Sequence, residues 1–207
     1  MLIPKAVAFL TGATADKKDR RGRFEHIYIK PGLAMATDTY MLVQLTFNGE
    51  NCQDYPLFNG VEEILDDYQP FLIHKDLVKS LEQSRDKKQS ALPSVRDTLG
   101  AVIEQSENKT SIYNTDLSSH NTVLARQDHE FPPIKIEDYR PRVGSARVIV
   151  NAGLLHKMTT VLHNMQKKKP LKLTMTIDDQ KHIIHFTATT ETGEQVEAFM
   201  LTIKTKD

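Results

Sequence analysis

The most informative part of the sequence is Gly32-Leu-Ala-Met-Ala-Thr-Asp-Thr-Tyr-Met-Leu-Val-Gln-Leu45. Two β-prone runs are separated by the polar pair Thr37-Asp38, which predicts a strand, a tight turn and a second strand. Asp38 could act as a general base, but a turn-stabilising bond from its side chain to the backbone is the favoured interpretation. A later stretch, Asp128-His-Glu-Phe-Pro-Pro-Ile134, predicts a strand that ends at two prolines.

The rest of the chain repeats one pattern three times, a helix followed by antiparallel strands. Apolar periodicity and turn residues place the boundaries. In the first unit the pattern predicts a helix at 4–11 and strands at 24–29, 33–36 and 39–47, with a missing or very short opening strand. After a short helix at 60–68, the second unit has a strand at 71–73, a helix at 74–84 and strands at 99–104, 110–113 and 121–125.

The third unit begins with a strand at 146–150 and a helix capped by Asn151. Strands at 171–177, 183–188 and 196–203 follow. Strand-helix-strand-strand-strand units of this kind predict an α+β fold with the helices on one face of antiparallel sheets. Pro132, Pro133 and Pro141 indicate a stiff linker. We therefore expect a two-unit domain at 1–140 and a half domain at 141–207.

Composition excludes several classes of protein. The chain has 207 residues, of which 39% are hydrophobic and 26% charged, as in ordinary soluble proteins. No apolar run approaches the roughly 18 residues of a membrane-spanning helix, and no convincing signal peptide is present. The single cysteine, Cys52, excludes an internal disulfide and a cysteine-based zinc site. We expect a cytoplasmic protein that does not associate with membranes.

The formal net charge is zero, but the basic residues are clustered. Three clusters hold 14 of the 27 Lys and Arg residues, and such a distribution can present a basic face to phosphates. The alternative is that these residues are solvated helix ends, where cations are favoured by the helix dipole. The clusters are Lys17, Lys18, Arg20, Arg21 and Arg23; Lys75, Lys79, Arg85, Lys87 and Lys88; and Lys157, Lys167, Lys168 and Lys169.

The sequence offers little for catalysis or for metal or cofactor binding. It contains no Gly-rich phosphate loop and no nucleophile elbow. His182 and His185 would lie on opposite faces of a strand. His156 and His163 would share a helix face, but no carboxylate partner is evident. We expect a binding protein without cofactor rather than an enzyme.

Five segments resemble the DNA sliding clamps of the bacterial polymerase III β-subunit type. In the family, Ala-Thr-Asp is followed by Gly-His-Arg, which is Thr39-Tyr40-Met41 here, and the closing Met-Pro is replaced by Thr202-Ile203. The segments are Met35-Ala-Thr-Asp-Thr-Tyr-Met-Leu42, Phe71-Leu-Ile-His-Lys-Asp-Leu-Val78, Arg126-Gln-Asp-His-Glu-Phe-Pro-Pro133, Val148-Ile-Val-Asn-Ala-Gly-Leu-Leu-His-Lys-Met158 and Glu197-Ala-Phe-Met-Leu-Thr-Ile203.

The resemblance implies a DNA-clamp-like fold and a processivity factor in DNA replication. A family subunit has three domains of two units, so this chain would match the middle domain and the second half of the last. Four copies would supply the twelve units of a closed ring, and a homo-oligomer is implied. The helices would face double-stranded DNA and contact its backbone without reading bases. The implied DNA-binding residues are Lys17, Lys18, Arg20, Arg21, Arg23, Lys75, Lys79, Arg85, Lys87, Lys157, Lys167, Lys168 and Lys169.

The resemblance also implies an apolar groove that binds peptides of a DNA polymerase or another clamp-binding protein. Its residues would be Thr37, Tyr40, Leu42, Pro132, Phe199, Met200 and Thr202. The alternative is a clamp-derived adaptor or decoy, of a phage or another mobile element, that binds replication partners without encircling DNA. The basic clusters favour the clamp, whereas the neutral net charge and the smaller number of units favour the adaptor.

Overall fold

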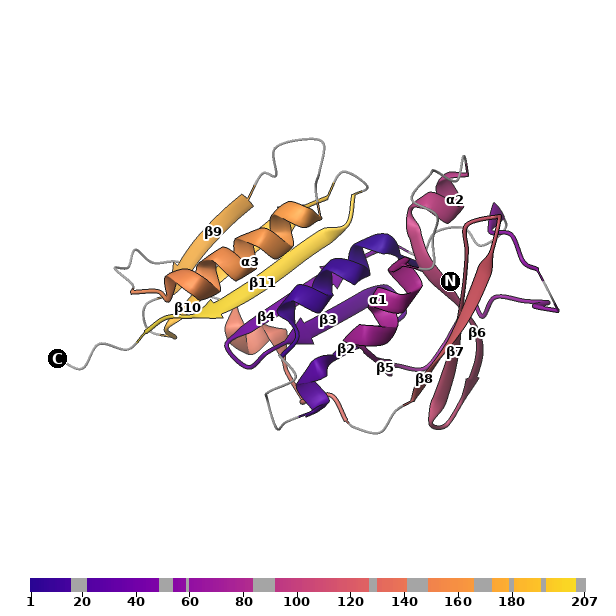
Figure 1. The fold of residues 1–207 in the computed structure, drawn as a ribbon. Helices are drawn as coiled ribbons and strands as arrows, with labels where there is room; N and C mark the ends of the chain where they lie inside the picture. The colour runs from indigo at the N-terminus through magenta and orange to yellow at the C-terminus, as the bar shows by residue number, and fades with distance from the viewer. Residues whose placement is uncertain are drawn as a thin grey trace.

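The computed structural model has the expected α+β architecture, with helices packed on one face of antiparallel sheets (Figure 1). It describes residues 1–15, 22–48, 54–58, 60–83, 92–126, 130–140, 149–165, 173–178, 181–190 and 193–203. In this part of the chain no helix is both long and apolar enough to span a membrane.

The first unit contains β1 (Leu2–Pro4), the 3-10 helices η1 (Lys5–Ala13) and η2 (Gly22–Glu25), β2 (His26–Lys30), β3 (Leu33–Thr37) and β4 (Met41–Thr46). The second contains β5 (Phe71–His74), α1 (Lys75–Gln83), α2 (Pro93–Arg96), β6 (Thr98–Ser106), β7 (Lys109–Thr115) and β8 (His120–Arg126). A connector at 130–140, which includes the 3-10 helix η4 (Ile136–Tyr139), leads to the third unit. That unit contains α3 (Ala152–Asn164), β9 (Leu173–Asp178), β10 (Ile183–Thr189) and β11 (Gln195–Leu201).

The strands form two sheets that tie the units together. The four-stranded sheet has the order β1-β6-β7-β8, and the seven-stranded sheet has the order β5-β2-β3-β4-β11-β10-β9. The first two units therefore exchange their opening strands, since β1 pairs with β6 and β5 pairs with β2. The third unit joins the first through the antiparallel pair β4 and β11.

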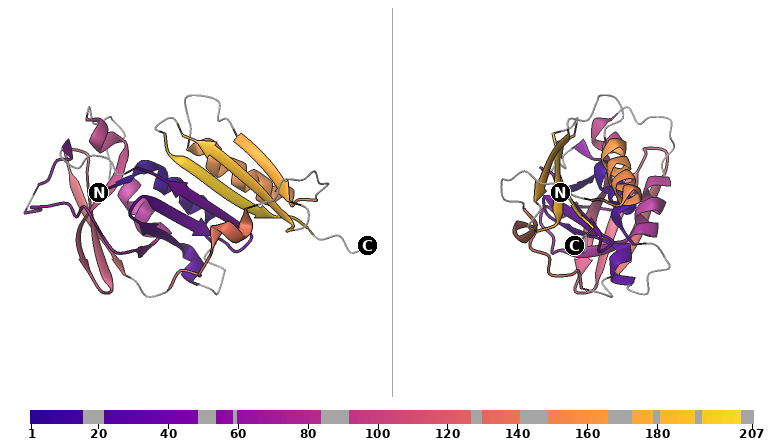
Figure 2. Two further views of the ribbon diagram at one scale, coloured as in Figure 1. Left: turned by 180° about the vertical axis from the view of Figure 1, so that it is seen from behind. Right: turned by 90° about the vertical axis from the view of Figure 1, so that its left-hand side faces the viewer.

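The two faces of the seven-stranded sheet are covered differently. On one face, η1 packs between α1 and α3 over a core that includes Ala36, Val43 and Ala198. A side chain at Gly12 would place its Cβ 2.6 Å from Val161 Cγ2, so the glycine permits the close approach of η1 and α3. On the other face, the connector covers a smaller apolar cluster, and the end view shows the two layers on opposite sides (Figure 2).

Local signals in the sequence explain most of these elements. Gly32 has a φ of +76° in the β2–β3 turn, a conformation that favours glycine. Asn151 caps α3 as predicted, because its Oδ1 accepts from the backbone N–H groups of Gly153 and Leu154 at 2.9 and 3.2 Å. The opening strand of the first unit is present as the three-residue β1.

Some predicted elements are wrong. The helix predicted at 60–68 is absent; Ile64 and Tyr68 are buried by an irregular segment, in which the N–H of Leu65 donates to the carbonyl of Val102. The strand predicted at 128–134 is not formed at 130–134, and its first two residues lie outside the described ranges. Of the strand predicted at 146–150, the described part forms only a bridge between Ile149 and Ile203. The one-turn helices α2 and η4 were not predicted.

The proposed division at residue 140 stays a prediction. The seven-stranded sheet contains strands from both predicted domains, and one hydrophobic core contains residues from all three units.

Candidate binding pocket

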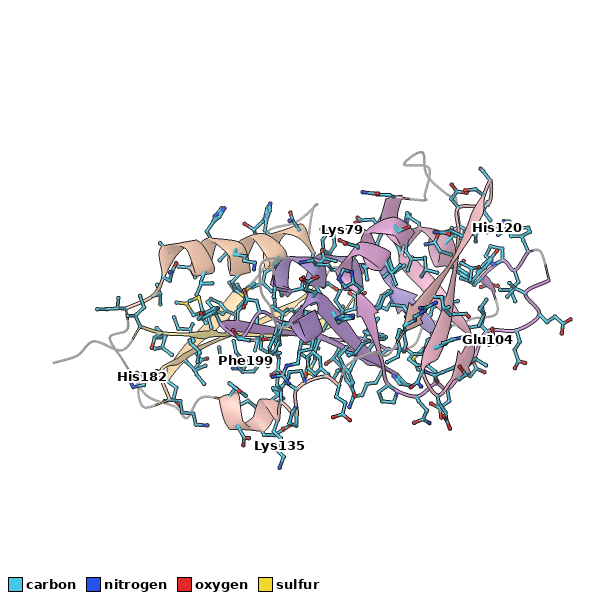
Figure 3. The ribbon with its side chains drawn as sticks, turned by 60° about the horizontal axis from the view of Figure 1, so that its bottom comes forward. Lys79, Glu104, His120, Lys135, His182 and Phe199 are labelled. Atoms are coloured by element: carbon cyan, nitrogen blue, oxygen red, sulfur yellow. The ribbon has the colours of Figure 1, made fainter. Side chains whose placement is uncertain are left out.

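A small apolar pocket of about 80 Å³ opens where β4 begins and β11 ends, on the sheet face covered by the connector. Figure 3 shows Phe199 in the middle of this region, above the connector that carries Lys135. Tyr40 and Leu201 are partly exposed at the pocket, with exposed fractions of 59% and 43%. The lining residues are Thr37, Thr39, Tyr40, Met41, Leu42, Ile134, Tyr139, Ile183, Phe199, Met200 and Leu201.

One wall of the pocket is the turn between β3 and β4. Asp38 Oδ1 accepts from the N–H groups of Tyr40 and Met41 at 3.0 and 2.9 Å, which confirms the favoured interpretation of this aspartate. Thr37 Oγ1 donates to the carbonyl of Met41 at 2.8 Å and accepts from the N–H of Thr39 at 3.0 Å. These bonds hold Thr39 at a φ of +78°, an uncommon conformation for a residue other than glycine.

The same turn is held from the third unit. Lys157 Nζ, on α3, donates to Asp38 Oδ2 at 3.0 Å, and the Asp38 side chain is about nine-tenths buried. Lys157 was predicted to face DNA, but in this structure its ammonium group is engaged by Asp38. One carboxylate oxygen of Asp38 thus accepts hydrogen bonds within the turn, and the other accepts a hydrogen bond from Lys157 in the third unit.

The floor of the pocket is aromatic. The ring of Phe199 stacks on the imidazole of His185, with centroids 4.5 Å apart and planes 2° apart, and Tyr139 lies 6.1 Å from the same ring. His185 Nε2 is 3.4 Å from Glu197 Oε1 without hydrogen-bond geometry. Burial lowers the pKa of His185; Arg140 lowers it further, and Glu197 opposes both effects.

The connector is held near both of its own ends. Phe131 stacks on Tyr28 with centroids 5.1 Å apart. Arg140 Nη2 donates to Glu197 Oε2 at 3.1 Å, and Lys181 Nζ donates to the carbonyls of Asp138 and Arg140 at 3.0 and 3.1 Å. The positions of Ile134 and Tyr139 in the pocket wall follow from these attachments.

Five of the seven residues predicted for the groove line this one pocket: Thr37, Tyr40, Leu42, Phe199 and Met200. Pro132 lies in the connector, where its carbonyl accepts from the N–H of Ile134, and Thr202 donates its N–H to the carbonyl of His182; neither lines the pocket. The prediction missed six lining residues. The apolar Ile134 and Tyr139 in a polar linker were the available signal; the others missed were Thr39, Met41, Ile183 and Leu201.

Four of the predicted DNA-binding residues can be placed. Arg23 and Lys79 are exposed, and the Arg23 guanidinium lies 5.0 Å from the ring centroid of Phe24. Lys75 was wrongly predicted, because it is only 6% exposed and donates to the carbonyl of Ala15. Lys157 is bonded to Asp38. The others lie outside the described residues: Lys17, Lys18, Arg20, Arg21, Arg85, Lys87, Lys167, Lys168 and Lys169.

A second, more polar hollow of about 420 Å³ lies where η2, β5 and β8 meet. His74 Nε2 is 2.9 Å from Glu25 Oε2, and the rings of His74 and His26 meet edge to face at 5.0 Å. Within the described ranges, no group of three or more His, Cys, Asp or Glu side chains is placed to hold a metal ion.

Solved structures that the chain matches include two bacterial sliding clamps and a PCNA complex. The chain matches the DNA polymerase sliding clamp from Bacillus subtilis with a TM-score of 0.45 at 13% identity, covering 99% of this chain and 49% of the clamp. For the C. crescentus beta sliding clamp the TM-score is 0.42 at 12% identity, covering 100% and 51%. For the PCNA2-PCNA3 complex from Sulfolobus tokodaii it is 0.46 at 8% identity, covering 97% of each chain.

The chain thus spans about half the length of the two bacterial clamp chains. No protein-family model and no curated protein matches it.

Replacing Asp38 should separate its two roles. We expect Asp38→Ala to lower the free energy of unfolding by about 1–3 kcal/mol, because two backbone N–H groups and a lysine lose their acceptor. Asp38→Asn keeps the acceptor for the turn and loses only the ion pair with Lys157. Because Lys157 is partly exposed, this variant should lower the free energy of unfolding by only about 0.5–1 kcal/mol. Urea unfolding at pH 7 measures both values.

Asp116→Asn is the matched control, because Asp116 Oδ1 accepts from the N–H groups of Ser118 and Ser119 in an equivalent turn of the second unit. A double-mutant cycle with Lys157→Met isolates the ion pair. A coupling energy of zero in that cycle would show that the contact between Asp38 and Lys157 does not stabilise the fold.

His185 should make stability depend on pH. Because its pKa is lowered in the folded state, the unfolded chain takes up the proton first as the pH falls below about 6.5. Stability should therefore be complete at pH 7 and decrease towards the lowered folded pKa. Urea unfolding at pH 7 and pH 5 should show a smaller difference for His185→Gln than for the unmodified chain.

His156→Gln, at an exposed position of α3, is the control and should keep the original pH dependence. If His185→Gln leaves the difference between the two pH values unchanged, burial of this imidazole is not its source.

Proposed function

We propose that this chain is a sliding-clamp-like processivity factor of the bacterial β-subunit type, which binds double-stranded DNA nonspecifically and tethers partner proteins through the pocket. The observation that carries the proposal is the pocket itself. Residues assigned to a peptide groove from two short segments, at 37–42 and 199–200, line one apolar hollow. The pairing of β4 with β11 brings these segments together from more than 150 residues apart.

The chemistry of the pocket favours an apolar peptide. Leu42, Phe199 and Met200 supply buried apolar surface, while the exposed ring of Tyr40 offers an aromatic contact at the rim. Binding sites for apolar ligands are lined mainly by hydrophobic and aromatic side chains, and aromatic residues often dominate such contacts. The expected partner is a DNA polymerase or another protein carrying a clamp-binding segment.

Two exposed residues of the predicted DNA-binding set, Lys79 and Arg23, are available for contact with DNA. Lys79 lies on α1, which packs on the helix side of the core, and Lys135 lies on the connector side (Figure 3). Arg23, the last residue in sequence of the basic cluster that begins at Lys17, is exposed. Contacts of this kind attract phosphates without reading bases, so binding would be mobile and salt-sensitive.

In this proposal the chain acts by binding rather than by catalysis, as a cytoplasmic homo-oligomer without a cofactor. A ring of four copies would contain twelve units. The alternative is an adaptor or decoy that keeps the pocket without encircling DNA. The engagement of Lys75 and Lys157 within the fold favours this alternative, because it removes two of the cations assigned to DNA.

The pocket can be tested with a fluorescein-labelled peptide rich in Leu and Phe, of the clamp-binding type, titrated by fluorescence polarisation. We expect saturable binding that Tyr40→Ala weakens roughly tenfold, since the substitution removes an exposed aromatic ring from the rim. The turn should persist in this variant, because Asp38 bonds the backbone rather than the side chain of Tyr40.

Leu124→Ala removes an exposed apolar side chain from β8, in the other sheet, and should bind the peptide normally. No saturable binding at high micromolar concentrations of folded protein would contradict the assignment of the pocket.

DNA binding is measured on linear and circular duplexes over a range of salt concentrations. We expect Lys79→Gln with Arg23→Gln to weaken binding and to reduce the slope of log K against log salt by about 0.9 for each phosphate that is no longer neutralised. Lys135→Gln, on the connector face, is the matched control and should leave the slope unchanged.

Salt-resistant retention on circular but not on linear DNA would identify a closed clamp. Peptide binding without any DNA binding would contradict the clamp and support the adaptor.

A further inference from the structure

β9 is the outermost strand of the seven-stranded sheet, and within the described residues it pairs only with β10. Its side chains alternate between the two faces of the sheet, and Ile177 packs against the core on the helix side. Leu173 and Met175 therefore point to the same side, with exposed fractions of 37% and 54%. An outer strand with exposed apolar side chains is a template for pairing with another strand.

The chain itself shows how its units cover such a strand. β2 and β6 are the first strands after the helices of the first and second units, as β9 is in the third unit. The edge of β2 is covered by β5, the opening strand of the second unit. The edge of β6 is covered by β1, the opening strand of the first unit. Each unit thus gives its opening strand to its companion.

The third unit has a segment in the place of an opening strand. Ile149 and Val150 come directly before the cap residue of α3, as β1 and β5 come directly before η1 and α1. The N–H of Ile203 donates to the carbonyl of Ile149 at 2.7 Å, and the Ile149 side chain is half exposed. The third unit therefore has an opening segment, Ile149-Val150, that is available to pair with another unit, and an outer edge, on β9, that is available to accept such a segment.

One flank of α3 is also suited to a second helix. Val161 faces η1 across Gly12, and at about 100° per residue Ala152, Leu155 and Thr159 lie on the far flank. This flank is uncharged; Ala152 is exposed, and Leu155 and Thr159 are half buried. The Thr159 hydroxyl is within hydrogen-bond distance of the carbonyl oxygens of Leu155 and His156, at 2.9 and 3.0 Å, so it can be satisfied within the helix. In the first two units the corresponding helices, η1 and α1, pack against each other.

We propose that two copies of this chain join through their third units, with Ile149-Val150 of each copy paired along β9 of the other and the two α3 helices side by side. The interface is a twofold one, because each copy gives and receives the same elements. It repeats between two chains the exchange that the first and second units make within one chain. The dimer contains six units, and the pockets of the two copies lie on the same face of the joined sheet.

This proposal deepens the homo-oligomer proposed above but requires neither peptide nor DNA binding. Among the described outer strands, β9 is favoured over β8 because β9 is the first strand after the helix of its unit. The two strands that receive an opening strand, β2 and β6, hold that same place, whereas β8, like β4, is the last strand of its unit. β8 is the natural alternative, since β4 pairs with β11 on that side.

The oligomer is measured by light scattering on the full 207-residue chain over a range of concentrations. We expect a mass of twice the 23.5 kDa of one chain, which Met175→Glu reduces to that of one chain by placing charges in the interface. Leu124→Glu is the matched control on β8, where Leu124 is 41% exposed, and it should remain a dimer. A chain that is monomeric at every concentration, or a dimer that Leu124→Glu but not Met175→Glu dissociates, overturns the proposal.

Hydrogen exchange of the unmodified chain gives a test that does not depend on the folding of a variant. Amides of residues 173–178 should exchange more slowly at high than at low protein concentration, while those of β8 should not change. Equal exchange at both concentrations overturns the proposal. Peptide titration of the Met175→Glu monomer separates the two proposals, because binding there should persist: the pocket lies between other strands.

Discussion

The antiparallel pairing of β4 with β11 is the interaction on which the pocket depends. It sets Met200 opposite Met41 and Phe199 opposite Leu42, joining the last strand of the third unit to that of the first. A shift of one residue would reverse the face of every side chain in one of the strands. Phe199 would then leave the pocket, and Ala198 would leave the helix-side core. The hydrophobic pattern therefore fixes the register as well as the contact.

Asp38 links this register to the helix layer. Its carboxylate orders the turn that begins β4 and also accepts a bond from Lys157 on α3. The bond to Lys157 requires the third unit to lie over the first, with η1 close to α3 at Gly12. The pocket wall and the helix packing are consequently parts of one arrangement, which explains how a polar residue can be nearly buried beside an apolar site.

The sequence was most informative where a local pattern determines the structure. Alternating residues around Gly32 and the Asn151 cap predicted their elements well, because turn and cap preferences act over a few residues. The segment at 60–68 failed because Ile64 and Tyr68 have helical spacing, yet both are buried by an irregular segment. A short apolar pattern shows that side chains are buried, but it does not specify the secondary structure of the segment that buries them. One or two turns of 3-10 or α-helix, as in η4, carry too few residues to show a period.

The candidate site was predicted unevenly for a related reason. Pocket residues belong to strands, whose direction is fixed by register, so segments that pair bring their side chains to one place. Lysines carry long chains whose ends can bond a distant element. Lys75 reaches the carbonyl of Ala15 and Lys157 reaches Asp38, across 60 and 119 residues of sequence. A cluster of cations therefore indicates charge but not its partner. Which cations hold this fold together and which remain exposed depends on the packing of the units.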